Sequence, residues 1–206
     1  MNKSFSMLRC GLAAAMAAVT LSGCAALLVG GAAVGTALMV SDRRTSGVQI
    51  EDQAIELKAA NRIRETVGDR GHISATSYNR MVLLTGEVAS DADRAAIEQT
   101  VARIENVRSI VNELAVMGSS SMTSRSNDTV LTSKVKASFI DAKDIQANTI
   151  KVVTERGTVY LMGRVTEREA TRAAELARGV SGVQKVVRVF EILTEAELAA
   201  MGGSRS

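Results

Sequence analysis

The chain has 206 residues, with 25 Lys and Arg, 22 Asp and Glu, one His, two Cys, and no Pro or Trp. This nearly balanced charge and the scarcity of aromatic side chains exclude the basic, aromatic-rich surfaces with which proteins bind nucleic acid. The lone histidine, His72, and the absence of cysteine after Cys24 leave no nucleophile–base pair and no zinc ligand set, so we do not expect an enzyme.

The first 24 residues have the pattern of an export signal. Lys3 and Arg9 precede an apolar run at residues 11–21, which is too short to span a bilayer as a mature helix. Leu-Ser-Gly-Cys at residues 21–24 resembles the lipobox of bacterial lipoproteins, in which cleavage before the Cys leaves a thiol that receives diacylglycerol. We predict a signal peptide at residues 1–23 and lipid attachment at Cys24, and no cofactor besides the diacylglycerol and N-acyl chain there. An ordinary secretory signal with an incidental Cys is the alternative.

Residues 24–50 are predicted to be a lipidated apolar tether. Residues 25–40 are rich in Ala, Gly, Leu and Val, but a run of 16 residues with three glycines favours a flexible tether near the bilayer surface over a transmembrane helix. Residues 42–47 are then expected to lie in water. By analogy with bacterial lipoproteins, Ala25 in place of Asp after the Cys favours the outer membrane. A triacylated Cys24 buries several chains at about 0.8 kcal/mol per CH₂ and should stay bound.

The rest of the chain contains two copies of one unit. Val-Leu-Leu-Thr-Gly-Glu-Val at residues 82–88 returns as Val-Tyr-Leu-Met-Gly-Arg-Val at residues 159–165, which is 163 − 86 = 77 positions later. Such a repeat indicates one small domain used twice. We place the first domain at residues 51–117 and the second at residues 128–193, with a Ser-rich linker at residues 118–127 between them.

Hydrophobic spacing and turn residues predict the same elements in both domains. In the first domain these are a helix at 51–67 opened by Asp52, strands at 73–77 and 81–88 around a turn at 78–80, a helix from Ser90 or Asp91 to about 104, and a strand at 107–117. In the second they are a helix capped by Asp128 to about 140, strands at 150–154 and 158–165 around a turn at 155–157, a helix from Thr166 or Glu167 to about 178, and a strand at 183–193.

The predicted fold is therefore α+β, with two tandem αββαβ domains. A strand–helix–strand connection crosses over right-handed, so the last strand should run parallel to one strand of the hairpin. Two helices would cover one face of a three-stranded mixed sheet. Gly86 and Gly163 occupy equivalent places near the end of the second strand, where glycine indicates close packing and not a binding site. In residues 194–206, a capping box from Thr194 to Glu197 predicts a short helix to about residue 201, before a disordered tail.

The two domains carry opposite charge. Residues 51–117 contain 8 Lys and Arg and 11 Asp and Glu, a net charge of −3, while residues 128–193 contain 11 and 8, a net charge of +3. This division points to different partners for the two domains. Attraction between the domains themselves is the other explanation.

Both units resemble the BON domain (bacterial osmotic-stress and nodulation domain). The resemblance rests on the motif apolar-x-apolar-x-Gly-x-Val at residues 82–88 and 159–165, and on Gly-Val-x-x-Val at residues 182–186. The first copy departs from the second motif, with Asn106 for its Gly and Ile110 for its last Val. Residues 126–129 and 162–170, with the lipobox, are similar to an outer-membrane, division- and stress-associated family of lipid-binding lipoproteins.

This resemblance implies a lipid-anchored protein on the periplasmic face of the outer membrane. It implies binding to anionic phospholipid membranes, a part in keeping the cell envelope intact and in the stress response, and enrichment at the division site. Envelope assembly or division proteins are further candidate partners, whereas nucleic acid is not. None of these functions follows from composition.

The helix expected from Asp128 offers a candidate surface for phospholipid binding. At about 100° per residue, Leu131, Val135, Ser138 and Phe139 form one stripe, which we assign to the core. Another flank places apolar side chains beside lysines, which can enter the headgroup boundary and meet lipid phosphates. It consists of Val130, Ser133, Lys134, Lys136, Ala137 and Ile140. In the other interpretation the lysines are merely solvated, and the first domain buries Val130 or Ile140.

An alternative function is that of a protein-interaction module. The acidic first domain, or an exposed edge of a small mixed sheet, would then serve the envelope assembly machinery.

Overall fold

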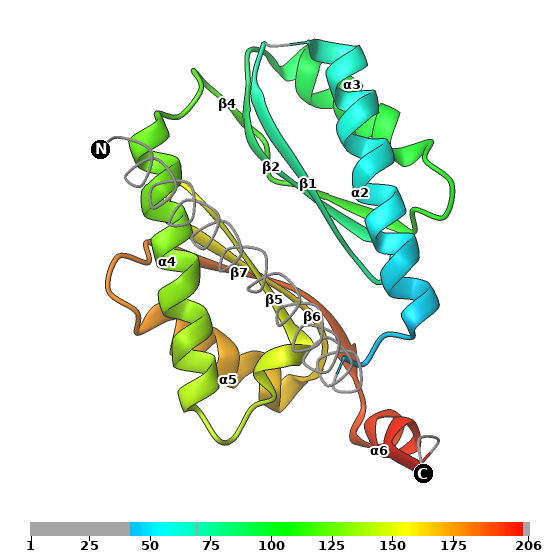
Figure 1. The fold of residues 1–206 in the computed structure, drawn as a ribbon, viewed down its shortest axis with the longest axis vertical. Helices are drawn as coiled ribbons and strands as arrows, with labels where there is room; N and C mark the ends of the chain where they lie inside the picture. The colour runs from blue at the N-terminus through cyan, green and yellow to red at the C-terminus, as the bar shows by residue number, and fades with distance from the viewer. Residues whose placement is uncertain (1–41, 69, 204–206) are drawn as a thin grey trace, which may run out of the picture. The chain divides into compact units, whose positions relative to one another are not determined.

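The computed structural model describes residues 42–68 and 70–203 (Figure 1). The predicted signal peptide, Cys24 and the predicted tether up to residue 41 lie outside the described residues, as do residues 204–206 of the predicted tail. The first domain contains α2 (Ser46–Val67), β1 (His72–Tyr78), β2 (Met81–Val88), α3 (Asp91–Ala102), β3 (Ser109–Asn112) and β4 (Ala115–Val116). The second contains α4 (Met122–Asp141), the 3₁₀ helix η1 (Ala147–Thr149), β5 (Ile150–Glu155), β6 (Thr158–Thr166), α5 (Glu167–Arg178) and β7 (Lys185–Leu193), followed by α6 (Glu195–Gly203).

Both sheets have the predicted mixed topology. β1 pairs antiparallel with β2, and β2 pairs parallel with β3 and β4; in the second sheet β6 lies between antiparallel β5 and parallel β7. The expected last strand of the first domain is interrupted between β3 and β4, where the Oδ1 atom of Asn112 accepts a hydrogen bond from the N–H of Leu114. The prediction that the last strand runs parallel to one strand of the hairpin is confirmed in both copies.

The hairpin turns in both domains are held by an aspartate from the neighbouring helix. Asp52 accepts hydrogen bonds from the N–H groups of Asn79 and Arg80, and Asp128 accepts them from Arg156 and Gly157, all at 2.8 Å. All four turn residues have positive φ, which is typical of a tight hairpin turn.

The prediction that Asp52 and Asp128 open their helices was wrong. α2 begins at Ser46, capped by Thr45, and α4 begins at Met122, capped by Ser121. Both aspartates lie inside their helices and are buried. The early start of α4 also replaces the second half of the predicted linker. Aspartate is a preferred cap, so a local pattern cannot distinguish a cap from a carboxylate that binds a distant turn.

Other predicted helix starts are confirmed. Ser90 caps α3, and Thr166 forms a capping box with Glu169 at the start of α5. Thr194 and Glu197 make the expected reciprocal hydrogen bonds before α6. α6 ends at Gly203, two residues beyond the predicted end, so the helix includes the first residues assigned to a disordered tail.

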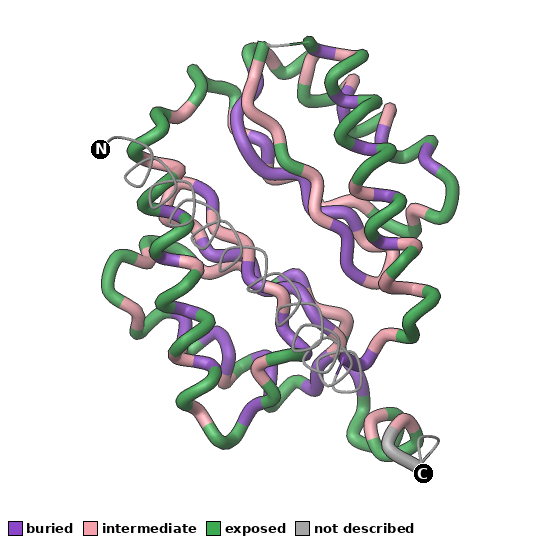
Figure 2. The backbone as a smooth tube through the Cα atoms, viewed as in Figure 1, coloured by how far each residue is buried: buried purple, intermediate pink, exposed green. Residues whose placement is uncertain are grey.

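Each domain has its own core, and the two sheets share a third (Figure 2). Within a domain, alternate strand residues meet the inner sides of the two helices, and the predicted core residues Leu131, Val135 and Phe139 are buried in this way. The sheet faces turned away from the helices meet through Tyr78, Leu83, Tyr160, Met162 and Val189. α2 and α4 consequently cover opposite outer faces of the paired sheets.

Gly86 and Gly163 pack closely, as predicted. A Cβ at Gly86 would overlap the carbonyl oxygen of His72, and Gly86 also has a φ of 115°. A Cβ at Gly163 would lie 2.5 Å from the carbonyl oxygen of Thr149. The hairpin partner therefore excludes a side chain at both positions.

Candidate lipid-contact surface

All six residues predicted to contact phospholipid are exposed on the outer side of α4. The interpretation in which the other domain buries Val130 or Ile140 is wrong, because these side chains are 54% and 72% exposed. The core face of α4 explains their position, since Leu131, Val135 and Phe139 fix the opposite side of the helix against the sheet. We call this set, Val130, Ser133, Lys134, Lys136, Ala137 and Ile140, the outer face of α4.

The structure adds Met122, which the sequence analysis missed. Because α4 begins six residues before Asp128, Met122 lies on the helix and is 74% exposed. At 100° per residue it shares the direction of Ile140, so this side of α4 has an exposed apolar side chain near each end. Ser121 was the available signal, since serine before an apolar residue is a common helix cap.

The two lysines of the outer face form no ion pair with the residues that the structure describes. Lys134 lies beside a hollow of about 630 Å³ that Val130, Arg156 and Gln184 also line. Lys136 and Ile140 border a second hollow of about 330 Å³, together with Arg44 and Lys151. The arginine at each hollow is already paired, Arg156 with Glu87 and Arg44 with Asp42 and Asp52. At these two hollows, Lys134 and Lys136 are therefore the cations without an ion pair to a described residue, and they are open to an external phosphate.

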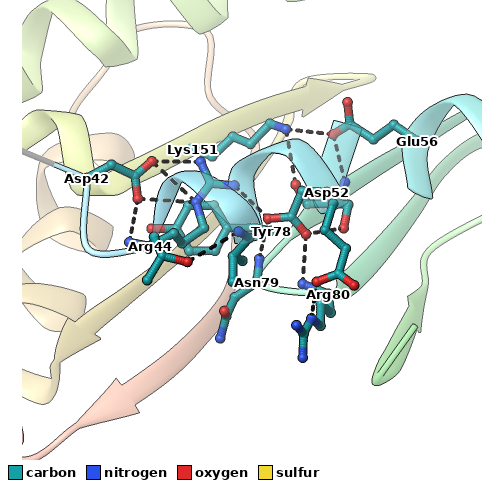
Figure 3. A network of polar contacts seen from close by, with 12 residues as sticks. Asp42, Arg44, Asp52, Glu56, Tyr78, Asn79, Arg80 and Lys151 are labelled. Carbon is teal, nitrogen blue, oxygen red and sulfur yellow. Dashed lines mark hydrogen bonds and ion pairs between the residues drawn. The ribbon is translucent and has the colours of Figure 1, made fainter. Parts of the chain in front are cut away.

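The segment before α2 is part of the folded unit: residues 45–47 are exposed, as the prediction of a return to water requires, but residues 42 and 43 are not. Asp42 and Arg43 are buried. Arg44 lies over the ring of Tyr78, 4.0 Å from the ring centre, and donates to Asp42 and Asp52, as Figure 3 shows. Burial lowers the pKa of Arg44, but the hydrogen bonds to Asp42 and Asp52 outweigh burial and raise that pKa above its ordinary value. The guanidinium therefore stays charged. Burial also raises the pKa of Tyr78 to about 12, so the hydroxyl stays neutral.

Arg43 makes a buried ion pair with the second domain. Its guanidinium donates two hydrogen bonds of 2.7 Å to the carboxylate of Glu169, which itself accepts from the N–H of Thr166. Burial alone would raise the pKa of Glu169, but the hydrogen bonds from Arg43 and Thr166 outweigh it and lower that pKa. Glu169 is therefore ionised at neutral pH.

Some of the oppositely charged residues of the two domains form ion pairs with each other. Glu56 of the first domain pairs with Lys151 of the second, and Glu87 pairs with Arg156, both at 2.7 Å. Burial raises the pKa of Glu87, but hydrogen bonds from Arg156 and Ser120 lower it below its usual value. Attraction between the domains thus explains some of the opposite charge, while Lys134 and Lys136 are left for other partners.

The described part of the chain holds no group of three or more His, Cys, Asp or Glu side chains arranged to bind a metal ion. Across residues 42–68 and 70–203, no helix is long and apolar enough to span a membrane. The lone His72 lies in a polar hollow at the domain interface, where burial and then Arg125 lower its pKa.

Comparison with known proteins gives one family for both halves of the chain. Residues 51–118 and residues 127–194 each match the BON domain. Outer membrane lipoprotein DolP of Haemophilus influenzae is 37% identical over 180 residues, which cover 86% of this chain and 92% of that protein. The 21 kDa hemolysin of Actinobacillus pleuropneumoniae is 30% identical over 151 residues, covering 72% and 78%. Osmotically-inducible protein Y of Escherichia coli is 28% identical over 145 residues, covering 66% and 70%.

Proposed function

We propose, because the chain belongs to the BON-domain family and is an outer membrane lipoprotein, that it binds anionic phospholipid through α4 of its second domain. Binding there would help to keep the outer membrane intact, with enrichment at the division site and a part in the stress response. Membership of this lipoprotein family agrees with the expectation that the chain is not an enzyme.

The proposed anchor is Cys24, acylated after removal of residues 1–23. We assign residues 51–117 and 128–193 to the two domains; the BON-domain match spans residues 51–118 and 127–194. The structure shortens the predicted tether, because residues 42–50 already belong to the folded unit. Mass spectrometry of the native protein tests the anchor, and an unmodified amino terminus would contradict it.

The outer face of α4 supports lipid binding through its combination of side chains. Val130 and Ile140 expose apolar surface, which stabilises insertion by about 25 cal/mol for each Å² that leaves water. Lys134 and Lys136 flank that surface, and each cation contributes about 1 kcal/mol near an anionic bilayer. These contributions are small singly, but an anchor on the same chain raises the local concentration of lipid and makes them effective.

Vesicle flotation tests the proposal with soluble protein that lacks Cys24. We expect the parent protein to float with anionic vesicles and to stay behind with neutral ones. The double variant Lys134→Glu, Ile140→Glu should lose binding. The control Leu57→Glu, Lys58→Glu changes the charge equally at exposed positions of α2 and should bind like the parent. Equal binding to both vesicle types, or equal loss in both variants, would refute binding by α4.

A second candidate function is protein binding by the first domain. Ile50 and Leu57 of α2 lie two turns apart on the outer face opposite α4, and they are 65% and 66% exposed. A surface turned away from α4 is free for an envelope assembly or division protein while α4 contacts lipid. A photo-crosslinking residue at Leu57 should then give one protein adduct in cells that persists when α4 is mutated. The same residue at Glu105 is the control, and similar patterns at both sites would argue against the surface.

A further inference from the structure

A polar hollow of about 270 Å³ lies where the two domains meet. Its walls come from β1 and β2 of the first domain and from α4 and β5 of the second. They include His72 and Thr85 on one side and Arg125, Thr154 and Glu155 on the other. No residue of the outer face of α4 lines this hollow. It is therefore distinct from the proposed lipid-contact surface.

Two side chains at this hollow are buried without a hydrogen-bond partner. Thr85 is 1% exposed, and its Oγ1 atom makes no hydrogen bond with the described residues. Glu155 is 6% exposed, and its carboxylate makes neither a hydrogen bond nor an ion pair with them. A polar group that loses water without gaining a partner is costly, and most buried polar groups have one. Two such groups at one hollow indicate a polar ligand.

The repeat shows that the fold does not require polar residues at these two positions. Thr85 and Glu155 are equivalent to Met162 and Tyr78, because 162 − 85 = 77 and 155 − 78 = 77, which is the distance between the two copies. Met162 and Tyr78 are buried together in the core that the two sheets share. The same pair of positions thus forms a packed contact in one place and a polar hollow in the other. Departures of this kind from a pattern that packs well are expected at functional sites.

The charges around the hollow favour a cationic ligand. Glu155 has two carboxylates near it, Glu87 and Asp128, and two guanidinium groups, Arg125 and Arg156. Glu87 is paired with Arg156, and Asp128 accepts the N–H groups of the hairpin turn. Arg125 donates to a backbone carbonyl oxygen of the linker at 3.1 Å. Three negative charges face two positive ones, and Glu155 is the carboxylate whose charge is not offset by a direct partner.

An ammonium group fits this set of side chains better than a metal ion. Hard divalent cations take six or more oxygen ligands, usually with several carboxylates, and the described residues hold no group of three His, Cys, Asp or Glu that could bind one. An ammonium needs one opposite charge and acceptors for its three N–H donors. Glu155 and the Thr85 hydroxyl are two acceptors. His72 is a third, because burial lowers its pKa and keeps the imidazole neutral at pH 7.

The hollow also limits the size of the ligand. A water molecule takes about 30 Å³ of the liquid, so the hollow holds on the order of nine non-hydrogen atoms. Ile73 and Val153 line it as well, and they suit a short carbon chain. We propose that the hollow binds a small primary ammonium, with Glu155 as its counter-charge and Thr85 as a hydrogen-bond acceptor. This site is independent of the proposed function of α4.

NMR titration of the soluble protein used for flotation tests the site, with ethanolamine at pH 7 as the probe. The amide signals of Thr85, Val153 and Glu155 should shift and saturate. Tetramethylammonium has the same charge but no N–H donor, so it should leave them unchanged. Glu155→Gln should weaken binding at least about tenfold and Thr85→Val about threefold, because each removes one acceptor. Glu167→Gln is the control, with the same charge change at an exposed position.

Both variants should fold, so that a loss of binding is not a loss of structure. Thr85→Val removes a hydroxyl that has no partner, and Glu155→Gln removes an unpaired buried charge. Neither should lower the unfolding temperature, and ethanolamine should raise it in the parent more than in either variant.

The ammonium can belong to a free amine or to the ethanolamine headgroup of a phospholipid. A second titration therefore uses phosphatidylcholine vesicles with and without phosphatidylethanolamine. Shifts at the hollow with ethanolamine alone identify a free amine, and shifts that require phosphatidylethanolamine identify the headgroup. An equal response to tetramethylammonium, unchanged binding by Glu155→Gln, or no response to either probe would overturn the site.

Discussion

The helix that opens each domain has the same inner side in both copies and a different outer side. Ala59 and Ile63 of α2 occupy the places of Val135 and Phe139 of α4 in their cores. The outer sides differ in composition and pairing. Lys58 of α2 has an acidic neighbour, Glu105, at 3.9 Å, whereas its counterpart Lys134 has none among the described residues. The fold thus requires the inner side, and the outer side is where the two copies can acquire different functions.

The buried aspartates test whether the shared inner side is equally important in both copies. Asp128→Ala removes the acceptor of two turn N–H groups and should cost about 3 kcal/mol of unfolding free energy. Asp52→Ala should cost more, about 4–5 kcal/mol, because Asp52 also accepts from Ser77 and Arg44. Urea denaturation measures both, with Asp141→Ala as an exposed control on α4. An effect of Asp128→Ala no larger than the control would mean that the turn does not need the carboxylate.

The paired glycines extend the comparison to the strands. Gly86→Ala should cost roughly 3 kcal/mol, because the added Cβ meets backbone and the φ of 115° is strained for alanine. Gly163→Ala should cost less, about 2 kcal/mol, since only the close contact with Thr149 opposes it. Gly118→Ala, with open space around it, should be nearly neutral. Thermal unfolding ranks the three, and a larger effect at Gly163 than at Gly86 would contradict the strain argument.

The sequence predicted the architecture because each element repeats a local pattern in both copies. Apolar spacing placed Leu131, Val135 and Phe139 in the core, and the same spacing put Val130 and Ile140 outside. Turn residues and the crossover rule then predicted the hairpins and the parallel last strand. These signals depend on neighbours along the chain, so they were available without the structure.

The contacts that were missed join residues far apart in the sequence. Arg43 and Glu169 are 126 positions apart, and no local pattern marks either of them as a partner. Asp52 and Asp128 looked like caps because their bonds to the turns span 27 to 29 residues. The burial of residues 42 and 43 could be found only when these distant groups were brought together, whereas Thr45 and Ser121 were local signals for the starts of α2 and α4.

The residue before each hairpin turn differs between the two domains, and this difference should make the stability of the protein depend on pH. Tyr78 holds this place in the first domain and Glu155 in the second, where its carboxylate is buried near Glu87 and Asp128. Burial, and then the charge of Glu87, raise the pKa of Glu155. An acid with a raised pKa in the folded state stabilises the fold below its unfolded pKa, and loses that contribution as the pH rises through the folded pKa.

Glu155→Gln should therefore stabilise the protein at pH 7, by an amount on the order of 1 kcal/mol. The gain should shrink as the pH falls toward about 4.3, the ordinary pKa of glutamate. Denaturation midpoints across this range measure it, and Glu167→Gln serves as an exposed control. A gain that does not vary with pH would exclude the carboxylate charge as its cause.

Substitution of Lys134 in α4 and of Lys58 in α2 tests the outer sides of the two helices directly. These substitutions have the smallest expected effect on stability. Lys134→Gln and Lys58→Gln should each leave the unfolding free energy within about 0.5 kcal/mol, because surface substitutions rarely do more. Lys134→Gln should weaken binding of soluble protein to anionic vesicles about fivefold, the equivalent of about 1 kcal/mol, whereas Lys58→Gln should not.

Raising the salt concentration should reduce the difference between these variants, since exposed charges are screened over about 10 Å at 0.1 M. Vesicle titrations at two ionic strengths measure both effects. If the two variants lose affinity equally, net charge and not the outer face of α4 determines binding. The divergence between α2 and α4 would then be a consequence of drift on two solvated helices, and the inner side would be the only part of either helix under functional constraint.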